Sequence, residues 1–163
     1  MEKSLLRFEK IKIWEFGVML FYIILSVAFL FFLKLAKSET QNSYLTAYAV
    51  SGQLLLYTIL YKSLRNFKVY IFWLIISLFH LCLYFLLKEN GAYIKFHNNH
   101  IVGLRNTFIL IILFQILRFV SLKIQNQELV SIGRSKTDIY DQRETTKTDN
   151  ILYLVYIVST FLL

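Results

Sequence analysis

The 163-residue chain contains no proline, a single cysteine and five glycines. One cysteine, Cys82, cannot form a disulfide within the chain, which excludes a disulfide scaffold and a dithiol redox enzyme. Proline is commoner in membrane helices than in soluble ones, and it kinks them. Its absence therefore predicts straight helices, packed as a static bundle.

The motifs of common catalytic and metal sites are also missing. The chain has no phosphate-binding glycine loop, zinc-protease motif, serine nucleophile elbow or paired acids within an apolar run. His97 and His100 have a spacing that suits metal ligands, but zinc needs three or four ligands and their loop adds only Glu89. Ordinary loop polarity is the favoured interpretation of these histidines. The sequence thus predicts a protein that is not an enzyme and holds no cofactor.

Apolar residues are in excess in this chain. Hydrophobic residues make up 57% of the chain and charged residues 17%, with a mean hydropathy of +0.55. A soluble domain has about 45–50% apolar and about 25% charged residues. The apolar excess is also gathered into runs that match the ~20 residues of a membrane-spanning helix. This pattern indicates a multi-pass membrane protein.

Four apolar runs reach spanning length, and a fifth does not. The first is too long for the ~7–15-residue core of a signal peptide, so we interpret it as a span. The fifth run has 13 residues and covers ~20 Å of a ~30 Å hydrocarbon core. The fold class we expect is an all-α integral membrane bundle with four transmembrane helices and a short C-terminal hydrophobic helix. The four spans are residues 16–33, 44–61, 69–87 and 101–122 (or 106–122), and the short run is 151–163.

Three regions follow from this pattern: a transmembrane domain (1–122), a cytoplasmic helix extension and linker (123–150), and the hydrophobic helix (151–163). Residues 124–132 can prolong the fourth helix, and Gly133 suits the residue that ends it. Two repeats of hydroxyl-Lys-Thr-Asp, at 135–138 and 146–149, resemble capping boxes, and the second one predicts where the last helix begins. A phosphate or metal site in this charged linker is the less favoured interpretation.

Lysine and arginine are distributed unequally between the connecting segments. Four precede the first span, three follow the second and five follow the fourth, which places twelve on one side against five on the other. Basic loops remain on the cytoplasmic side, so the N-terminus is expected there, or in the matrix of an organelle. The net charge of +8 is explained by this orientation rather than by nucleic-acid binding. The composition, rich in Phe, Ile, Lys and Asn, favours the inner membrane of a low-GC bacterium or of an organelle.

Arg118 is the only fixed charge well inside a span, and Gln115 lies on the same face of that helix. An intramembrane charge is a functional candidate by default. The functional interpretation is that Arg118 and Gln115 contact an anionic lipid, a substrate or a carboxylate of a partner. The favoured interpretation is that Arg118 extends to the interface and Gln115 bonds a neighbouring helix.

The third span carries a polar and aromatic stripe at helical spacing, which is expected to bond neighbouring helices. Ser77 and His80 are its candidate contact residues. His80 is also a candidate proton relay, whereas a bis-histidine haem would need a second histidine at the same depth. In the second span, Gln53 is expected to meet Gln115 or Ser77. The stripe consists of Tyr70, Trp73, Ser77, His80 and Tyr84.

The leading functional hypothesis is a non-catalytic subunit of a larger membrane complex, with other integral membrane subunits and membrane lipids as its partners. The alternative is a small homo-oligomeric channel or transporter with a polar path through His80, Gln115 and Arg118. A membrane-bound enzyme acting on lipid or quinone is a weaker third hypothesis, because the sequence supplies no nucleophile and base pair.

Overall fold

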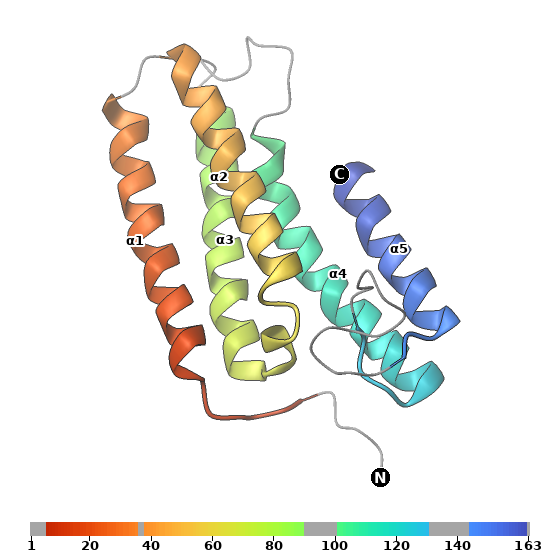
Figure 1. Cartoon of the computed structure of the whole chain (residues 1–163). Coiled ribbons are helices and arrows are strands. Elements are labelled where there is room, and N and C mark those ends of the chain that lie inside the picture. Colours follow the sequence, from red (N-terminus) through yellow and green to blue (C-terminus); the bar gives the residue numbers. More distant parts are fainter. Residues whose placement is uncertain (1–5, 36–37, 90–100, 131–143, 163) are drawn as a thin grey trace.

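The computed structural model describes residues 6–35, 38–89, 101–130 and 144–162. These residues form five α-helices and one short 3-10 helix, and consecutive long helices run in opposite directions (Figure 1). The all-helical fold class is thereby confirmed for the described part of the chain. The elements are α1 (Ile13–Leu35), α2 (Ser38–Thr58), η1 (Ser63–Arg65), α3 (Phe67–Glu89), α4 (Val102–Gln125) and α5 (Lys147–Leu162).

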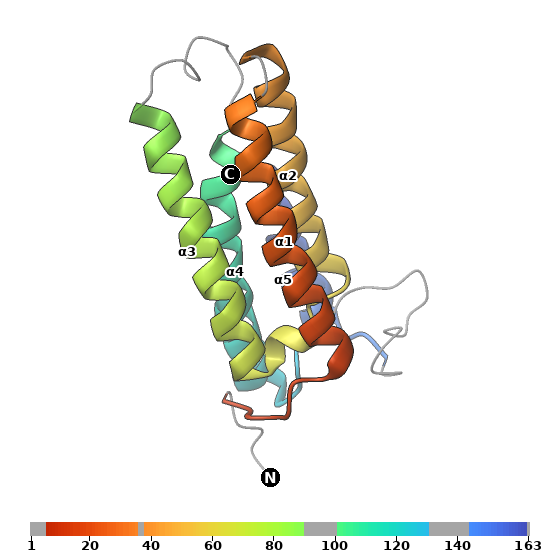
Figure 2. The same ribbon diagram turned by 90° about the vertical axis from the view of Figure 1, so that its left-hand side faces the viewer.

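α4 is the central helix of the bundle, because it packs against α2, α3 and α5. α1 lies beside α2 on the side of the bundle that is seen in Figure 2. The end of the bundle at which α1 begins also holds η1, the end of α4 and the start of α5 (Figure 1). We call this end the base.

Three of the helices are long and apolar enough to cross a membrane: α1, α3 over Phe67–Lys88, and α4. α2 is not among them, although it contains most of the second apolar run. It begins with six polar residues, 38–43, and ends at Thr58, before the run does. The structure therefore supports a membrane protein with three candidate spans rather than the four expected from the sequence.

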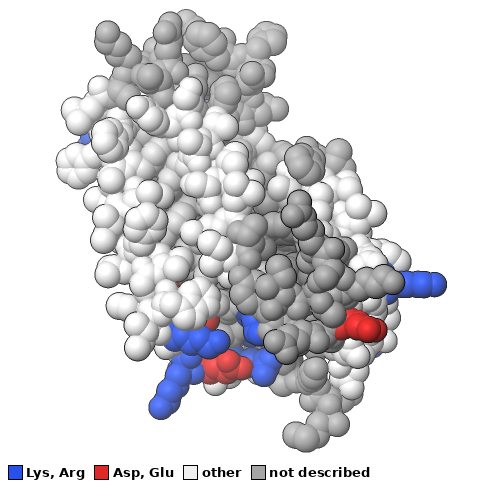
Figure 3. All heavy atoms as spheres, in the orientation of Figure 1, with Lys and Arg blue, Asp and Glu red and all other residues white. Residues whose placement is uncertain are grey.

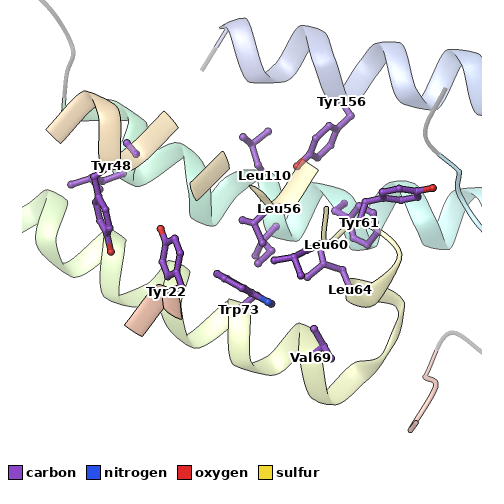
Figure 4. Close-up of a cluster of buried hydrophobic side chains, with 14 of the residues drawn as sticks. Tyr22, Tyr48, Leu56, Leu60, Tyr61, Leu64, Val69, Trp73, Leu110 and Tyr156 are labelled. Carbon is purple, nitrogen blue, oxygen red and sulfur yellow. The ribbon is translucent and has the colours of Figure 1, made fainter. Parts of the chain in front are cut away.

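The core lies where α1 to α4 converge, and aromatic side chains fill much of it (Figure 4). Trp73 of α3 meets Tyr22 of α1 edge to face, with ring centroids 5.0 Å apart. Tyr156 points from α5 toward Leu110 of α4 (Figure 4). Large apolar side chains such as Phe21, Phe31 and Ile75 are also exposed, as expected for helices that face lipid.

The predicted extension of α4 through 124–132 is wrong, because the helix ends at Gln125. Asn126 adopts a left-handed conformation (φ 51°), and its amide donates to the Leu122 carbonyl at 3.1 Å. Asparagine tolerates this conformation better than most residues. The chain then turns back, and residues 128–130 become buried. Gly133, the expected helix end, lies outside the described residues.

The second capping box is confirmed. Asp149 accepts a hydrogen bond from the Thr146 amide at 2.9 Å, and Thr146 Oγ1 accepts one from the Asp149 amide at 3.1 Å. These reciprocal bonds satisfy two amides at the start of α5, as in a standard capping box. The first box, at 135–138, falls outside the described residues.

Gly52 of α2 provides a test of how tightly α1 and α2 pack. A Cβ at Gly52 would lie 2.5 Å from Tyr22 Oη, whereas a Cβ at Gly17 of α1 would meet nothing within 4 Å. The Tyr22 ring is buried and cannot move aside freely. Gly52→Ala should therefore lower the free energy of unfolding by about 1–3 kcal/mol.

Gly17→Ala is the matched control, and it should be neutral or stabilising by up to about 1 kcal/mol, because alanine favours helix. Thermal unfolding of the detergent-solubilised variants measures both effects. Equal stability of the two variants would contradict the close contact between α1 and α2.

Candidate functional site

Three segments that are far apart in the sequence meet at the base. The segment 6–12 lies against the junction of η1 and α3, where the Phe67 amide donates to the Arg7 carbonyl at 2.8 Å. Arg65 of η1 donates from Nη2 to the Leu129 carbonyl at 2.6 Å, which ties η1 to the turn after α4. The base is thus held together by hydrogen bonds between these segments, and not by contacts within a single segment.

Arg118 forms a buried ion pair at this end of α4. Its Nε lies 2.7 Å from Glu128 Oε2 and its Nη2 lies 2.9 Å from Oε1, so the contact is bidentate. Arg118 is only 1% exposed. Its side chain therefore does not extend to the surface, and its carboxylate partner belongs to the same chain. The turn at Asn126 makes this possible, because it returns Glu128 to the face of α4 that carries Arg118.

Gln115 connects this ion pair to η1. Its Oε1 accepts from Arg118 Nη1 at 3.4 Å, and its Nε2 donates to the Leu64 carbonyl at 3.3 Å. Arg7 Nη1 lies 3.6 Å from Glu128 Oε1 and adds a second cation near the carboxylate. Gln115 and Arg118 therefore bond to each other, to the backbone of η1 and to Glu128 of the same chain.

The electrostatics of the base favour an ionised Glu128. Burial opposes ionisation, but the hydrogen bonds and charge of Arg118, with the charges of Arg65 and Arg7, outweigh it and hold the pKa of Glu128 below its usual value. A bidentate arginine–carboxylate pair is also geometrically specific. The pair therefore fixes the turn after α4 in one position.

A second polar cluster lies deeper in the bundle, where α1, α2 and α3 meet. His80 Nε2 lies 3.0 Å from Tyr48 Oη and 3.2 Å from Tyr22 Oη. Ser26 Oγ donates to the Tyr22 carbonyl at 2.8 Å and lies 2.6 Å from Tyr48 Oη. Figure 4 shows Tyr22 and Tyr48 within the same core.

The bonds of Ser26 assign the hydroxyl proton of Tyr48. Because the Ser26 hydroxyl donates to a carbonyl, Tyr48 is the donor in its 2.6 Å contact with Ser26 Oγ. Nδ1 of His80 has no hydrogen-bond partner within the described part of the chain.

The other residues singled out from the sequence lie elsewhere. Ser77 is fully buried, and it donates to the Leu74 carbonyl of its own helix at 2.8 Å. Gln53 donates to the Gly103 carbonyl at 2.8 Å, so it joins α2 to α4 and meets neither Gln115 nor Ser77. The structure brings Arg118 and Gln115 together, but it places His80 in a separate cluster with different partners.

Sequence reasoning missed the residues that complete both clusters. Glu128 was assigned to a continuing helix, and its pairing with Arg118 depends on the turn at Asn126. Tyr22 and Ser26 have the i, i+4 spacing of a common helix face, which is the signal that could have indicated them. Over 6–35, 38–89, 101–130 and 144–162, no group of three or more histidine, cysteine or acidic side chains is arranged to hold a metal ion.

No protein-family model, curated protein or solved structure matches the chain.

The ion pair gives a quantitative prediction. Arg118→Met would leave Glu128 buried without its main partner, which should lower the free energy of unfolding by about 3–5 kcal/mol. Arg118→Met combined with Glu128→Met removes both charges, so the double variant should be more stable than the single one. Chemical unfolding in detergent measures both values, and Glu9→Gln, at a half-exposed pair with Arg7, is the control for a surface charge.

The pH dependence of unfolding is a second readout of the same pair. Because the folded-state pKa of Glu128 is lowered, its contribution is fully present above the unfolded-state pKa of 4.5 and is lost as pH falls through the folded-state value. Wild type should therefore lose more stability on acidification than Glu128→Gln. If wild type and Glu128→Gln lost the same stability on acidification, and if the effects of Arg118→Met and Glu128→Met on the free energy of unfolding were additive, Arg118 and Glu128 would not be a coupled pair.

Proposed function

We propose that the chain is a non-catalytic integral membrane subunit of a larger complex, in which it has a structural or assembly role. Its four long helices cross the membrane, and α5 is a short hydrophobic helix that packs on α4 from the base. The proposed partners are other integral membrane subunits and membrane lipids. Four features support the proposal: the polar start of α2, the basic segments at the base, the separation of the two polar clusters, and an apolar groove.

The proposal includes α2 as a fourth span, and its place in the bundle supports this. α2 has 21 residues, or about 32 Å of helix, and it connects the far end of α1 to the base. Its polar start lies at the end of the bundle opposite the base, beside the end of α1 (Figure 1). Water or headgroups at that end would solvate these side chains.

The orientation that we propose places the base on the cytoplasmic or matrix side. The segments before α1, between α2 and α3, and after α4 hold most of the lysine and arginine, and the structure gathers their described parts at the base (Figure 1). Basic segments are retained on the cytoplasmic side. The membrane is then the inner membrane of a low-GC bacterium or of an organelle, as the composition favours.

The observation that carries the proposal is an apolar groove between α2, α4 and α5. It has a volume of about 450 Å³, and its lining includes Val50, Leu54, Leu110 and Ile157, with Gln53 and Thr160 as polar members. A transmembrane helix of a partner subunit would fill this groove.

The alternative, a small homo-oligomeric channel or transporter, is favoured by one observation: Nδ1 of the buried His80 has no hydrogen-bond partner among the residues that the structure describes. A conducting path also needs neighbouring polar groups. His80 bonds to Tyr22 and Tyr48, whereas Gln115 and Arg118 bond at the base. These separate partners make the subunit the better-supported proposal.

The test is to fill the groove without introducing a charge. Val50→Trp places a bulky apolar group in the groove, and Ile75→Trp makes the same kind of change at an exposed position of α3 outside it. The tagged chain is expressed in its own host, extracted in mild detergent and examined by blue-native electrophoresis. Wild type and Ile75→Trp should migrate in a larger complex with other membrane proteins, and Val50→Trp should migrate as the free chain.

Two results would contradict the proposal. Wild type could migrate only as a monomer or a small homo-oligomer, which would remove the hetero-complex. Alternatively, the two tryptophan variants could behave alike, which would remove the groove as its interface. A thermal unfolding curve of Val50→Trp establishes that the variant is folded.

A further inference from the structure

A polar pocket of about 490 Å³ opens at the base, beneath the starts of α1 and η1. Four cationic side chains line it, two from the segment before α1 and two from the turn between α2 and α3. These are Arg7, Lys12, Lys62 and Arg65. None of them belongs to the residues that the sequence singled out, and none lies in the apolar groove.

The two carboxylates of the pocket do not balance these cations. Glu15 is 3% exposed, and its Oε2 accepts from the Lys12 amide at 2.8 Å, so it serves as the cap of α1. Glu9 lies 3.3 Å from Arg7 Nη2, and Glu128, 3.6 Å from Arg7 Nη1, is already paired with Arg118. With Arg118 and Glu128 included, five cations face three carboxylates, so a net positive charge remains at the pocket. Pockets with this charge between membrane helices suit anionic headgroups.

The wall of the pocket is fixed by Asn66, which is 6% exposed. Its Oδ1 accepts from the Glu9 amide at 3.3 Å, and its Nδ2 donates to the Glu9 carbonyl at 3.2 Å. Phe8 also packs edge to face on Phe67, with centroids 5.3 Å apart. Because these contacts hold the segment 6–12 against η1, cations from two distant segments are already positioned around one space. Such preorganisation lowers the entropy lost on binding.

The position of the pocket along α1 indicates which class of ligand it can meet. Trp14 also lines it and is 45% exposed, and tryptophan is enriched where membrane meets water. The charge-free part of α1 begins at Phe16, so the pocket lies at the level of lipid headgroups.

From these observations the geometry points to a binding site for a phosphate-bearing anion in this basal pocket, with the phosphate between the cations of segment 6–12 and those of the η1 turn. Two sources supply this chemistry, the headgroup of an anionic phospholipid and free phosphate. The site needs no partner subunit, so it does not depend on the proposed function.

The test compares two double variants of the full-length chain. Lys12→Gln with Lys62→Gln removes two cations of the pocket, and Lys10→Gln with Lys68→Gln removes two exposed cations of the base outside it. Native mass spectrometry counts the phosphatidylglycerol retained from mixed phosphatidylglycerol and phosphatidylcholine micelles. In a second experiment, the thermal unfolding temperature is measured at increasing concentrations of inorganic phosphate.

Wild type should retain one phosphatidylglycerol in preference to phosphatidylcholine, and the pocket variant should bind it about tenfold more weakly or worse. The control variant should bind as wild type does. If only inorganic phosphate raises the unfolding temperature, and only when the pocket lysines are present, the site stands with free phosphate as its ligand. Equal weakening in both double variants, or no response of wild type to either probe, would overturn the site.

Discussion

The structure depends on one constraint: a charged or polar group within the hydrocarbon core has no water to solvate it. The long helices follow this rule, since no Asp, Glu, Lys or Arg lies between Glu15 and Lys34 in α1 or between Lys68 and Lys88 in α3. In the face seen in Figure 3, charged side chains gather toward the base, a little blue shows at the upper left edge, and the described surface between these two places is uncharged. The polar groups that remain inside are bonded mainly to one another.

The base shows how the chain meets this constraint at α4. Arg118 lies more than a turn before the end of its helix, and the chain reverses at Asn126 to return Glu128 to it. The same reversal gives Arg65 a carbonyl to bond. One ion pair thus orders the turn after α4, η1 and, through Arg7, the N-terminal segment. A base ordered in this way would suit the proposed role of a rigid membrane subunit.

Much of this fold could be predicted from local patterns. Helices form at all five apolar runs, and the box at Thr146 and Asp149 marks the start of α5, because run length and capping depend on neighbouring residues only. The end of α4 could not be predicted, since the left-handed Asn126 is stabilised by the contact between Arg118 and Glu128, a residue that follows Asn126 in the chain. The partners of His80 come from α1 and α2, and their side chains meet only once three helices have packed.

The proposed four-span topology requires α2 to cross the membrane, which would bring the segment before α1 and the segment after α2 to one face. Labelling of single cysteines with a membrane-impermeant thiol reagent, in a Cys82→Ser background, measures this. Lys10→Cys and Lys62→Cys should react from the cytoplasmic or matrix face, and Lys34→Cys from the opposite face. Reaction of Lys62→Cys and Lys34→Cys from the same face would contradict the account.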